Sequence, residues 1–266
     1  MPSSPTRDLT QGPIARTLVV FALPILAGNV LQSLNGSVNA MWIGHYLGEA
    51  AITATANANN IMFLLIGLVF GVGMAATILV AQSMGAKDLQ QARRVMGTSA
   101  TFFGLASIGI AALGYPLSRH ILNWMGTPDA ALPLAESYLR VIFLAIPLLY
   151  LFAFVSAILR GAGDTRTPFL FLLLVVVLDV ILNPVLIFGW GPFPAMGITG
   201  AATATLVSNA ISFVAMLLWL YHRRHPLWIG RRQLHYFLPH AAILRANGDD
   251  FAGHAHDDEH GQQLWH

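Results

Sequence analysis

Residues 168–188 read Pro-Phe-Leu-Phe-Leu-Leu-Leu-Val-Val-Val-Leu-Asp-Val-Ile-Leu-Asn-Pro-Val-Leu-Ile-Phe, and their only charged side chain is Asp179. About 20 apolar residues in a helix cross the hydrocarbon core of a bilayer. Outside closed barrels, a membrane-spanning segment must be helical, because its backbone polar groups have to be satisfied within the segment. This stretch therefore predicts a transmembrane helix with one buried carboxylate.

Long runs without Asp, Glu, Lys or Arg recur along the chain. They separate Arg16 from Glu49, Glu49 from Lys87, Arg94 from Arg119, and Arg140 from Arg160, and from Arg166 to Arg223 the only charge is Asp179. A turn-forming string at 189–194 divides the last run in two. The pattern predicts an all-α integral membrane protein with six spans, near 17–43, 51–82, 95–117, 138–159, 168–188 and 196–221.

The composition excludes several classes of protein. The 266 residues are 56% hydrophobic and 10% charged, whereas soluble chains are close to a quarter charged. The absence of cysteine excludes disulfides and Cys-ligated zinc. We expect no nucleic-acid partner, no cofactor and no enzymatic activity, since neither a Ser/His/Asp set nor a glycine-rich phosphate loop is present.

Basic residues mark the cytoplasmic side of a membrane protein. They cluster before the first span, after the second, after the fourth and after the sixth, at Arg7, Arg16, Lys87, Arg93, Arg94, Arg160, Arg166, Arg223, Arg224, Arg231 and Arg232. We therefore expect a multi-pass protein of the cytoplasmic membrane with both termini inside. The predicted segments are a cytoplasmic N-terminus (1–16), a six-helix lobe (17–221), a basic connection (222–246) and a tail (247–266).

Short motifs follow one another in a specific order. Leu23-Pro24 is followed by Leu31-Gln32-Ser33-Leu34, and the string Ala81-Gln82-Ser83-Met84-Gly85-Ala86-Lys87 closes the second span. The later motifs are Met125-Gly126-Thr127-Pro128, the nine residues from Arg160 to Pro168, the seven from Asn183 to Gly189, and the six from Gly197 to Ala202. From about Leu9 to Tyr221 this series resembles the MATE family of multidrug exporters.

The resemblance implies one lobe of a twelve-helix transporter that exchanges organic molecules for protons or sodium. It also implies that a second lobe, which completes the cavity, is missing from this chain. Many relatives carry Asn then Asp where this chain has Asp179 then Asn183, and Asp where it has Asn39. Asp179 is then the titratable group of the lobe.

A carboxylate in the middle of a span costs at least a few kcal/mol, and it is by default a functional residue. Asn183 lies one turn further along the same helix face as Asp179. We predict a proton relay or cation-coupling site at Asp179, Asn183 and Asn39. A structural, hydrogen-bonded Asp179 is the alternative. The predicted polar residues of a substrate cavity are Asn35, Asn59, Thr205 and Asn209, each of which could equally form interhelical hydrogen bonds.

The tail has a different composition, with eight of the ten histidines after Tyr221. His254, His256 and His260 could bind zinc or nickel, which would suit a metal exporter. Read from the second base of each codon, however, residues 254–266 can encode a Met-rich apolar segment. We predict instead a frameshift upstream of about Asn247.

The sequence therefore predicts a cation-coupled antiporter of amphipathic drugs or other organic molecules, truncated to its N-terminal lobe. Its partners would be the small-molecule substrate, the bilayer, and either the missing lobe or a second copy. Four alternatives remain: a non-functional frameshift remnant, a half-transporter completed by homodimerisation, the metal exporter, and a lipid-linked oligosaccharide flippase.

Overall fold

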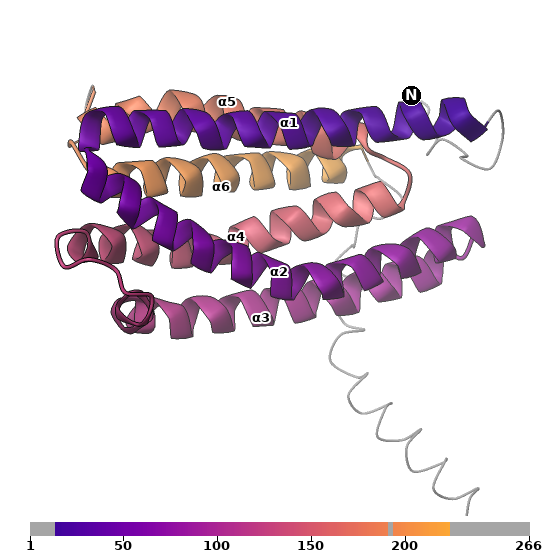
Figure 1. The fold of residues 1–266 in the computed structure, drawn as a ribbon. Helices are drawn as coiled ribbons and strands as arrows, with labels where there is room; N and C mark the ends of the chain where they lie inside the picture. Colours follow the sequence, from indigo (N-terminus) through magenta and orange to yellow (C-terminus); the bar gives the residue numbers. More distant parts are fainter. Residues whose placement is uncertain (1–13, 191–193, 224–266) are drawn as a thin grey trace, which may run out of the picture. The chain divides into compact units, whose positions relative to one another are not determined.

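The computed structural model describes residues 14–190 and 194–223, all within one compact unit of the chain. In this part the chain forms six helices, drawn in Figure 1. They are α1 (Ile14–Leu47), α2 (Glu49–Gly85), α3 (Leu89–Trp124), α4 (Leu132–Gly161), α5 (Arg166–Phe188) and α6 (Ile198–His222). Most of the predicted N-terminal segment, the basic connection and the tail, including His254, His256 and His260, lies outside the described residues.

The predicted all-α membrane fold is confirmed. Five of the described helices are long and apolar enough to cross a membrane, and α2 carries the apolar segment Gly73–Gly85. Helices α1 to α4 begin earlier and end later than the charge-free runs suggested. The helical ends outside the hydrocarbon can carry charges, as α3 does at Arg93 and Arg94. That end is capped by Asp88, whose side chain accepts a hydrogen bond from the Gln91 N–H at 2.9 Å.

The chain reverses direction at sharply defined positions. Gly48 alone separates α1 from α2, and its φ of 83° is a conformation that L side chains rarely adopt. Before α5, the Asp164 carboxylate accepts hydrogen bonds from the backbone N–H groups of Arg166 and Thr167, at 3.1 and 3.0 Å, and from the Thr167 hydroxyl. The Gly-Asp-Thr-Arg-Thr-Pro string is therefore a local device that starts α5.

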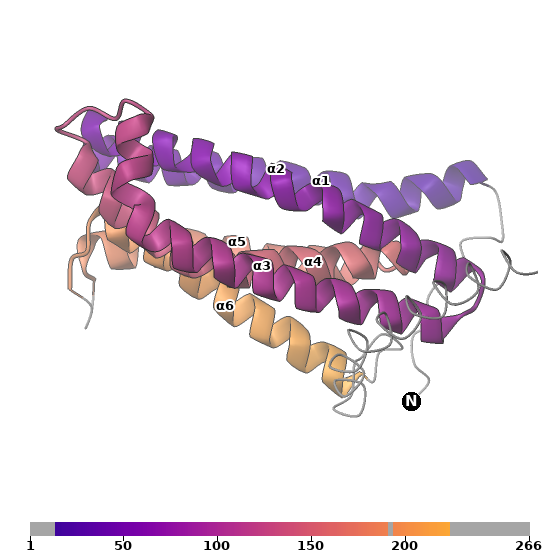
Figure 2. The same cartoon turned by 90° about the horizontal axis from the view of Figure 1, so that it is seen from below.

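Helix α4 lies at the centre of the helix packing. It packs against α3, α6 and α2, and more lightly against α5, while α5 and α6 pair closely with each other. Figure 2 shows α3 running alongside α4. In the most apolar 18-residue stretch of α4, half of the residues are buried. In the corresponding stretch of α1, which packs mainly against α5, 6% are buried. One broad face of α1 is therefore left uncovered.

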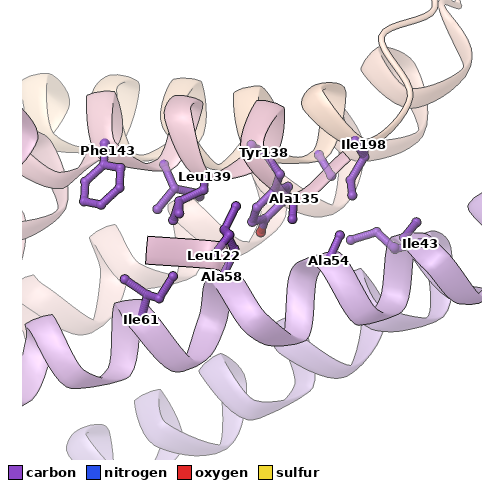
Figure 3. Close-up of a cluster of buried hydrophobic side chains, with 14 of the residues drawn as sticks. Ile43, Ala54, Ala58, Ile61, Leu122, Ala135, Tyr138, Leu139, Phe143 and Ile198 are labelled. Atoms are coloured by element: carbon purple, nitrogen blue, oxygen red, sulfur yellow. The ribbon is translucent and has the colours of Figure 1, made fainter. Parts of the chain in front are cut away.

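The main hydrophobic cluster gathers at one end of the lobe. Figure 3 shows Ile43 at the end of α1, Ala54 and Ala58 near the start of α2, and Leu122 at the end of α3. Side chains from the first half of α4 fill the centre of this cluster, and α6 contributes its first turn. The described helix ends on this side are thereby held together, while the uncovered face of α1 takes little part.

One glycine sets the spacing of the α5–α6 pair. A Cβ at Gly200 would lie 2.5 Å from the Leu186 carbonyl oxygen of α5. Real Cβ atoms essentially never approach a backbone oxygen so closely, so no larger residue fits there without moving a helix. This close approach brings the facing sides of α5 and α6 together around Asp179 and Thr205.

Candidate functional site

Asp179 lies in the interior of the lobe. It sits near the middle of α5 and is 1% exposed, and Asn183, one turn later, is fully buried. The flanking residues of α5 are aliphatic, so the polar partners of this carboxylate must come from other helices. Two neighbouring helices supply them.

Three neutral groups donate hydrogen bonds to the Asp179 carboxylate. The side-chain amides of Asn35 and Asn39, one turn apart on α1, both donate to Oδ2 at 2.9 Å. The hydroxyl of Thr205, on α6, donates to Oδ1 at 3.1 Å. Helices α1, α5 and α6 therefore meet at one carboxylate, and all three of these donors are neutral.

Asn183 closes a small ring of hydrogen bonds around the carboxylate. Its amide nitrogen donates to Asn39 Oδ1 at 2.5 Å and to the backbone carbonyl of Asp179 at 2.9 Å. Asn39 thus accepts from Asn183 while it donates to Asp179. The predicted trio of Asp179, Asn183 and Asn39 is one connected network, which we call the Asp179 network together with Asn35 and Thr205.

The Asp179 network offers oxygen atoms to a cation. Asn35 Oδ1 and Asn183 Oδ1 are buried and accept no hydrogen bond within the described part of the chain. An unpaired buried carbonyl is unfavourable, so each of these oxygens is disposed to accept a proton donor or to bind a hard cation. Carboxylate, amide and hydroxyl oxygens are the ligands that hard cations select.

The other predicted polar residues occupy different places. Thr205 belongs to the Asp179 network, and Asn209 lies beside it, donating to the Thr205 backbone carbonyl at 2.8 Å. Asn59 is exposed on α2 and makes no hydrogen bond to this network within the described residues. The prediction that assigned Asn35 to a substrate cavity did not foresee its bond to Asp179, although its spacing of four residues from Asn39 was the available signal.

Sequence reasoning also missed Tyr138. This tyrosine of α4 is 8% exposed and lies close enough to Asp179 for the two groups to interact electrostatically. No local pattern distinguishes it from a core aromatic residue, because its importance depends on how α4 packs against α5 and α6.

A separate apolar pocket opens between α2, α3 and α4. Its volume is about 540 Å³, and its lining includes Leu64, Ile110, Leu113 and Phe143, with Asn60 as a polar member. The size falls in the range of about 300–1,000 Å³ that small-molecule sites occupy. None of the residues of the Asp179 network lines it.

A family model described as MatE matches residues 24–185, more than half of the chain. The chain belongs to the MATE family. The matched range includes Asn35, Asn39, Asp179 and Asn183, and Thr205 lies beyond it.

Similar MATE-family proteins are known by sequence and by structure. Over 222 residues the chain is 36% identical to the probable multidrug resistance protein YoeA of Bacillus subtilis (strain 168), covering 84% of this chain and 48% of YoeA. It is 30% identical to a FAD transporter of Shewanella oneidensis, with 81% and 48% coverage. The crystal structure of MATE in the straight conformation superposes with a TM-score of 0.78 at 25% identity, covering 87% of this chain and 51% of that one. The chain spans about half the length of the curated relatives it matches.

Proposed function

We propose that this chain is the N-terminal lobe of a cation-coupled antiporter that exports amphipathic organic molecules across the cytoplasmic membrane. The observation that carries the proposal is the Asp179 network, in which a carboxylate inside a membrane domain receives hydrogen bonds only from neutral donors among the described residues. A single intramembrane charge needs a counter-charge, and a proton or a sodium ion supplies it.

The network can serve both states of a transport cycle. With the cation absent, Asn35, Asn39 and Thr205 satisfy the ionised carboxylate. With a proton bound, the new O–H donor finds an acceptor once the Asn35 amide turns, since Asn35 Oδ1 accepts no hydrogen bond from the described residues. With sodium bound, the same oxygen and that of Asn183 complete the ligand set. Coupling to an antiported substrate follows when α1 moves, because both asparagines of α1 would leave the carboxylate together.

Exposed polar groups on α1 favour a position beside a wet cavity or another lobe. Asn29, Gln32, Ser33 and Ser37 are all exposed on this helix. Such side chains are unfavourable against lipid and are stabilised by water or a protein partner. We propose that this face of α1 meets the substrate and a second lobe, supplied either by further chain or by a second copy of this one.

Transport in proteoliposomes tests the proposal. The chain is reconstituted alone, and efflux of the fluorescent organic cation ethidium is followed under an imposed proton or sodium gradient. We expect gradient-driven efflux that Asp179→Asn abolishes and that Ser107→Ala, which removes a hydroxyl bonded within α3, preserves. This efflux comes either from the chain alone as a dimer or only after co-expression with the C-terminal half of YoeA. Efflux that survives Asp179→Asn at the wild-type rate would refute the assignment of coupling to Asp179.

A further inference from the structure

Hydroxyl groups inside these helices fall into two sets. In the first set, the hydroxyl donates a hydrogen bond to a backbone carbonyl of its own helix. Ser107 donates to the Gly104 carbonyl at 2.9 Å and Ser118 to the Tyr115 carbonyl at 2.8 Å, and both side chains are fully buried. The other set is equally buried and does not do so. Within the described residues, the hydroxyls of Ser156, Ser208 and Ser212 have no hydrogen-bond partner.

Ser208 and Ser212 of α6 lie on the same face of this helix as Thr205 of the Asp179 network. Thr205, Ser208, Asn209 and Ser212 are spaced three, four and seven residues apart, which places them on one face of the helix. Thr205 holds Asp179, so this face points into the lobe. With a rise of about 1.5 Å per residue, Ser212 lies roughly 10 Å further along α6 than Thr205.

Ser156 belongs to α4, the helix that packs against α6. It is separated from Tyr138 by 18 residues, which is five turns of an α-helix, so the two share one face of α4. Tyr138 lies within electrostatic range of Asp179. Tyr150 also has an unpartnered hydroxyl, but it lies one turn from Phe154, whose ring packs on Phe103 of α3, and thus on another side of the helix.

An unpaired hydroxyl in an apolar interior costs on the order of 1–3 kcal/mol. Three of them on facing helices are best satisfied by buried water, which typically bonds to about three polar groups. The polar face of α6, from Thr205 to Ser212, leads from Asp179 toward the end of the lobe where α4 and α6 terminate. Arg160 at the end of α4 and Arg166 at the start of α5 stand at that end, which the proposed orientation places in the cytoplasm.

We propose that buried waters anchored by Ser208, Ser212 and Ser156 form a proton route between Asp179 and the cytoplasmic end of the lobe. At each water one O–H bond forms as another breaks, so that the net result is the movement of one proton along the route. The groups from other helices that hydrogen-bond to Asp179 are Asn35 and Asn39 of α1 and Thr205 of α6, and Tyr138 of α4 lies within electrostatic range. The inference rests on the proposed function, because it presumes that Asp179 exchanges protons.

Kinetics of protonation test the route. The full chain in nanodiscs receives a light-triggered pH jump, and the carboxyl band of protonated Asp179, identified by its loss in Asp179→Asn, is followed by infrared spectroscopy. We expect the double variant Ser208→Ala/Ser212→Ala to slow the rise of this band by about a hundredfold or more, in line with the effect of a positioned proton-transfer group. The equilibrium amplitude of the band should remain. The matched control, Ser107→Ala/Ser118→Ala, removes two hydroxyls that are satisfied within α3 and should leave the rate unchanged. Equal rates in the two double variants would overturn the route.

A measurement on the unmodified chain keeps the proposal testable if a variant does not fold. X-ray radiolysis generates hydroxyl radicals at bound water, which oxidise a neighbouring methionine. Met216 is fully buried one turn beyond Ser212, and Met96 is a buried methionine of α3. We expect Met216 to oxidise at a rate close to that of the exposed Met125, and Met96 far more slowly. Protection of Met216 equal to that of Met96 would overturn the route. A missing Asp179 band would instead contradict the proposed function.

Discussion

Removal of the Asn39 side chain should destabilise the lobe through the charge of Asp179. Asn39→Ala deletes the 2.9 Å hydrogen bond to Asp179 Oδ2 and the acceptor of the Asn183 amide. A hydrogen bond to a charged group contributes about 1.5–3 kcal/mol, and an interhelical bond between neutral groups in membranes contributes about 0.6 kcal/mol on average. We therefore expect the free energy of unfolding to fall by about 2–4 kcal/mol. Asn57→Ala is the matched control, because it removes one neutral bond, to Thr127 Oγ1 at 2.9 Å, and should cost about 0.6 kcal/mol.

A double-mutant cycle separates the charge from the packing. Asp179→Leu replaces the carboxylate by an apolar side chain, so that Asn39→Ala on this background loses only its contact with Asn183. Unfolding in lipid bicelles, followed by steric trapping, gives the four free energies. We expect a coupling between the two positions of about 1.5–3 kcal/mol. Additive effects, with coupling below about 0.5 kcal/mol, would show that Asn39 does not stabilise the Asp179 charge.

Three further outcomes are expected. Gly200→Ala should lower the free energy of unfolding by about 1–3 kcal/mol, because its Cβ would lie 2.5 Å from the Leu186 oxygen. Gly109→Ala, whose Cβ would meet nothing within 4 Å, should not lower it, and thermal unfolding compares the two variants. Asp164→Ala should cost about 0.5–2 kcal/mol by the same assay, because it removes the cap of α5. This loss should exceed that of Asp88→Ala, which removes the hydrogen bond from the Gln91 N–H, and equal losses would contradict this account. DNA sequencing past the codon for His266 should find a second frame encoding six further apolar spans, and noncoding sequence there would contradict the frameshift prediction.

Much of the fold was predictable because the bilayer imposes a strong rule on sequence. Charge-free runs had to be helices, and the six helices in the described part of the chain coincide with the six predicted spans to within their ends. Those ends were less predictable, because caps such as Asp88 and Asp164 extend helices beyond the hydrocarbon. Which helices pair was not predictable from hydropathy, because a centrally packed α4 and a largely uncovered α1 both consist of apolar residues.

The candidate site was predictable where it depends on a residue type that is rare inside membrane spans. One carboxylate in mid-span identified Asp179, and helical spacing added Asn183. The partners from other helices were only partly accessible: Thr205 and Asn35 were singled out as polar residues without their bond to Asp179, and Tyr138 was missed. The unpartnered hydroxyls of Ser208 and Ser212 could not be told from back-bonded serines by sequence, because the difference lies in side-chain orientation.

Equilibrium cation binding tests the central claim most directly. The purified chain in nanodiscs is titrated with ²²Na⁺ at several pH values, and proton release is recorded with a pH indicator in the same samples. We predict one saturable site per chain in which protons and sodium compete, absent in Asp179→Asn and unchanged in Asn59→Ala. Cation binding of the same stoichiometry in Asp179→Asn would contradict the assignment of Asp179 as the coupling carboxylate.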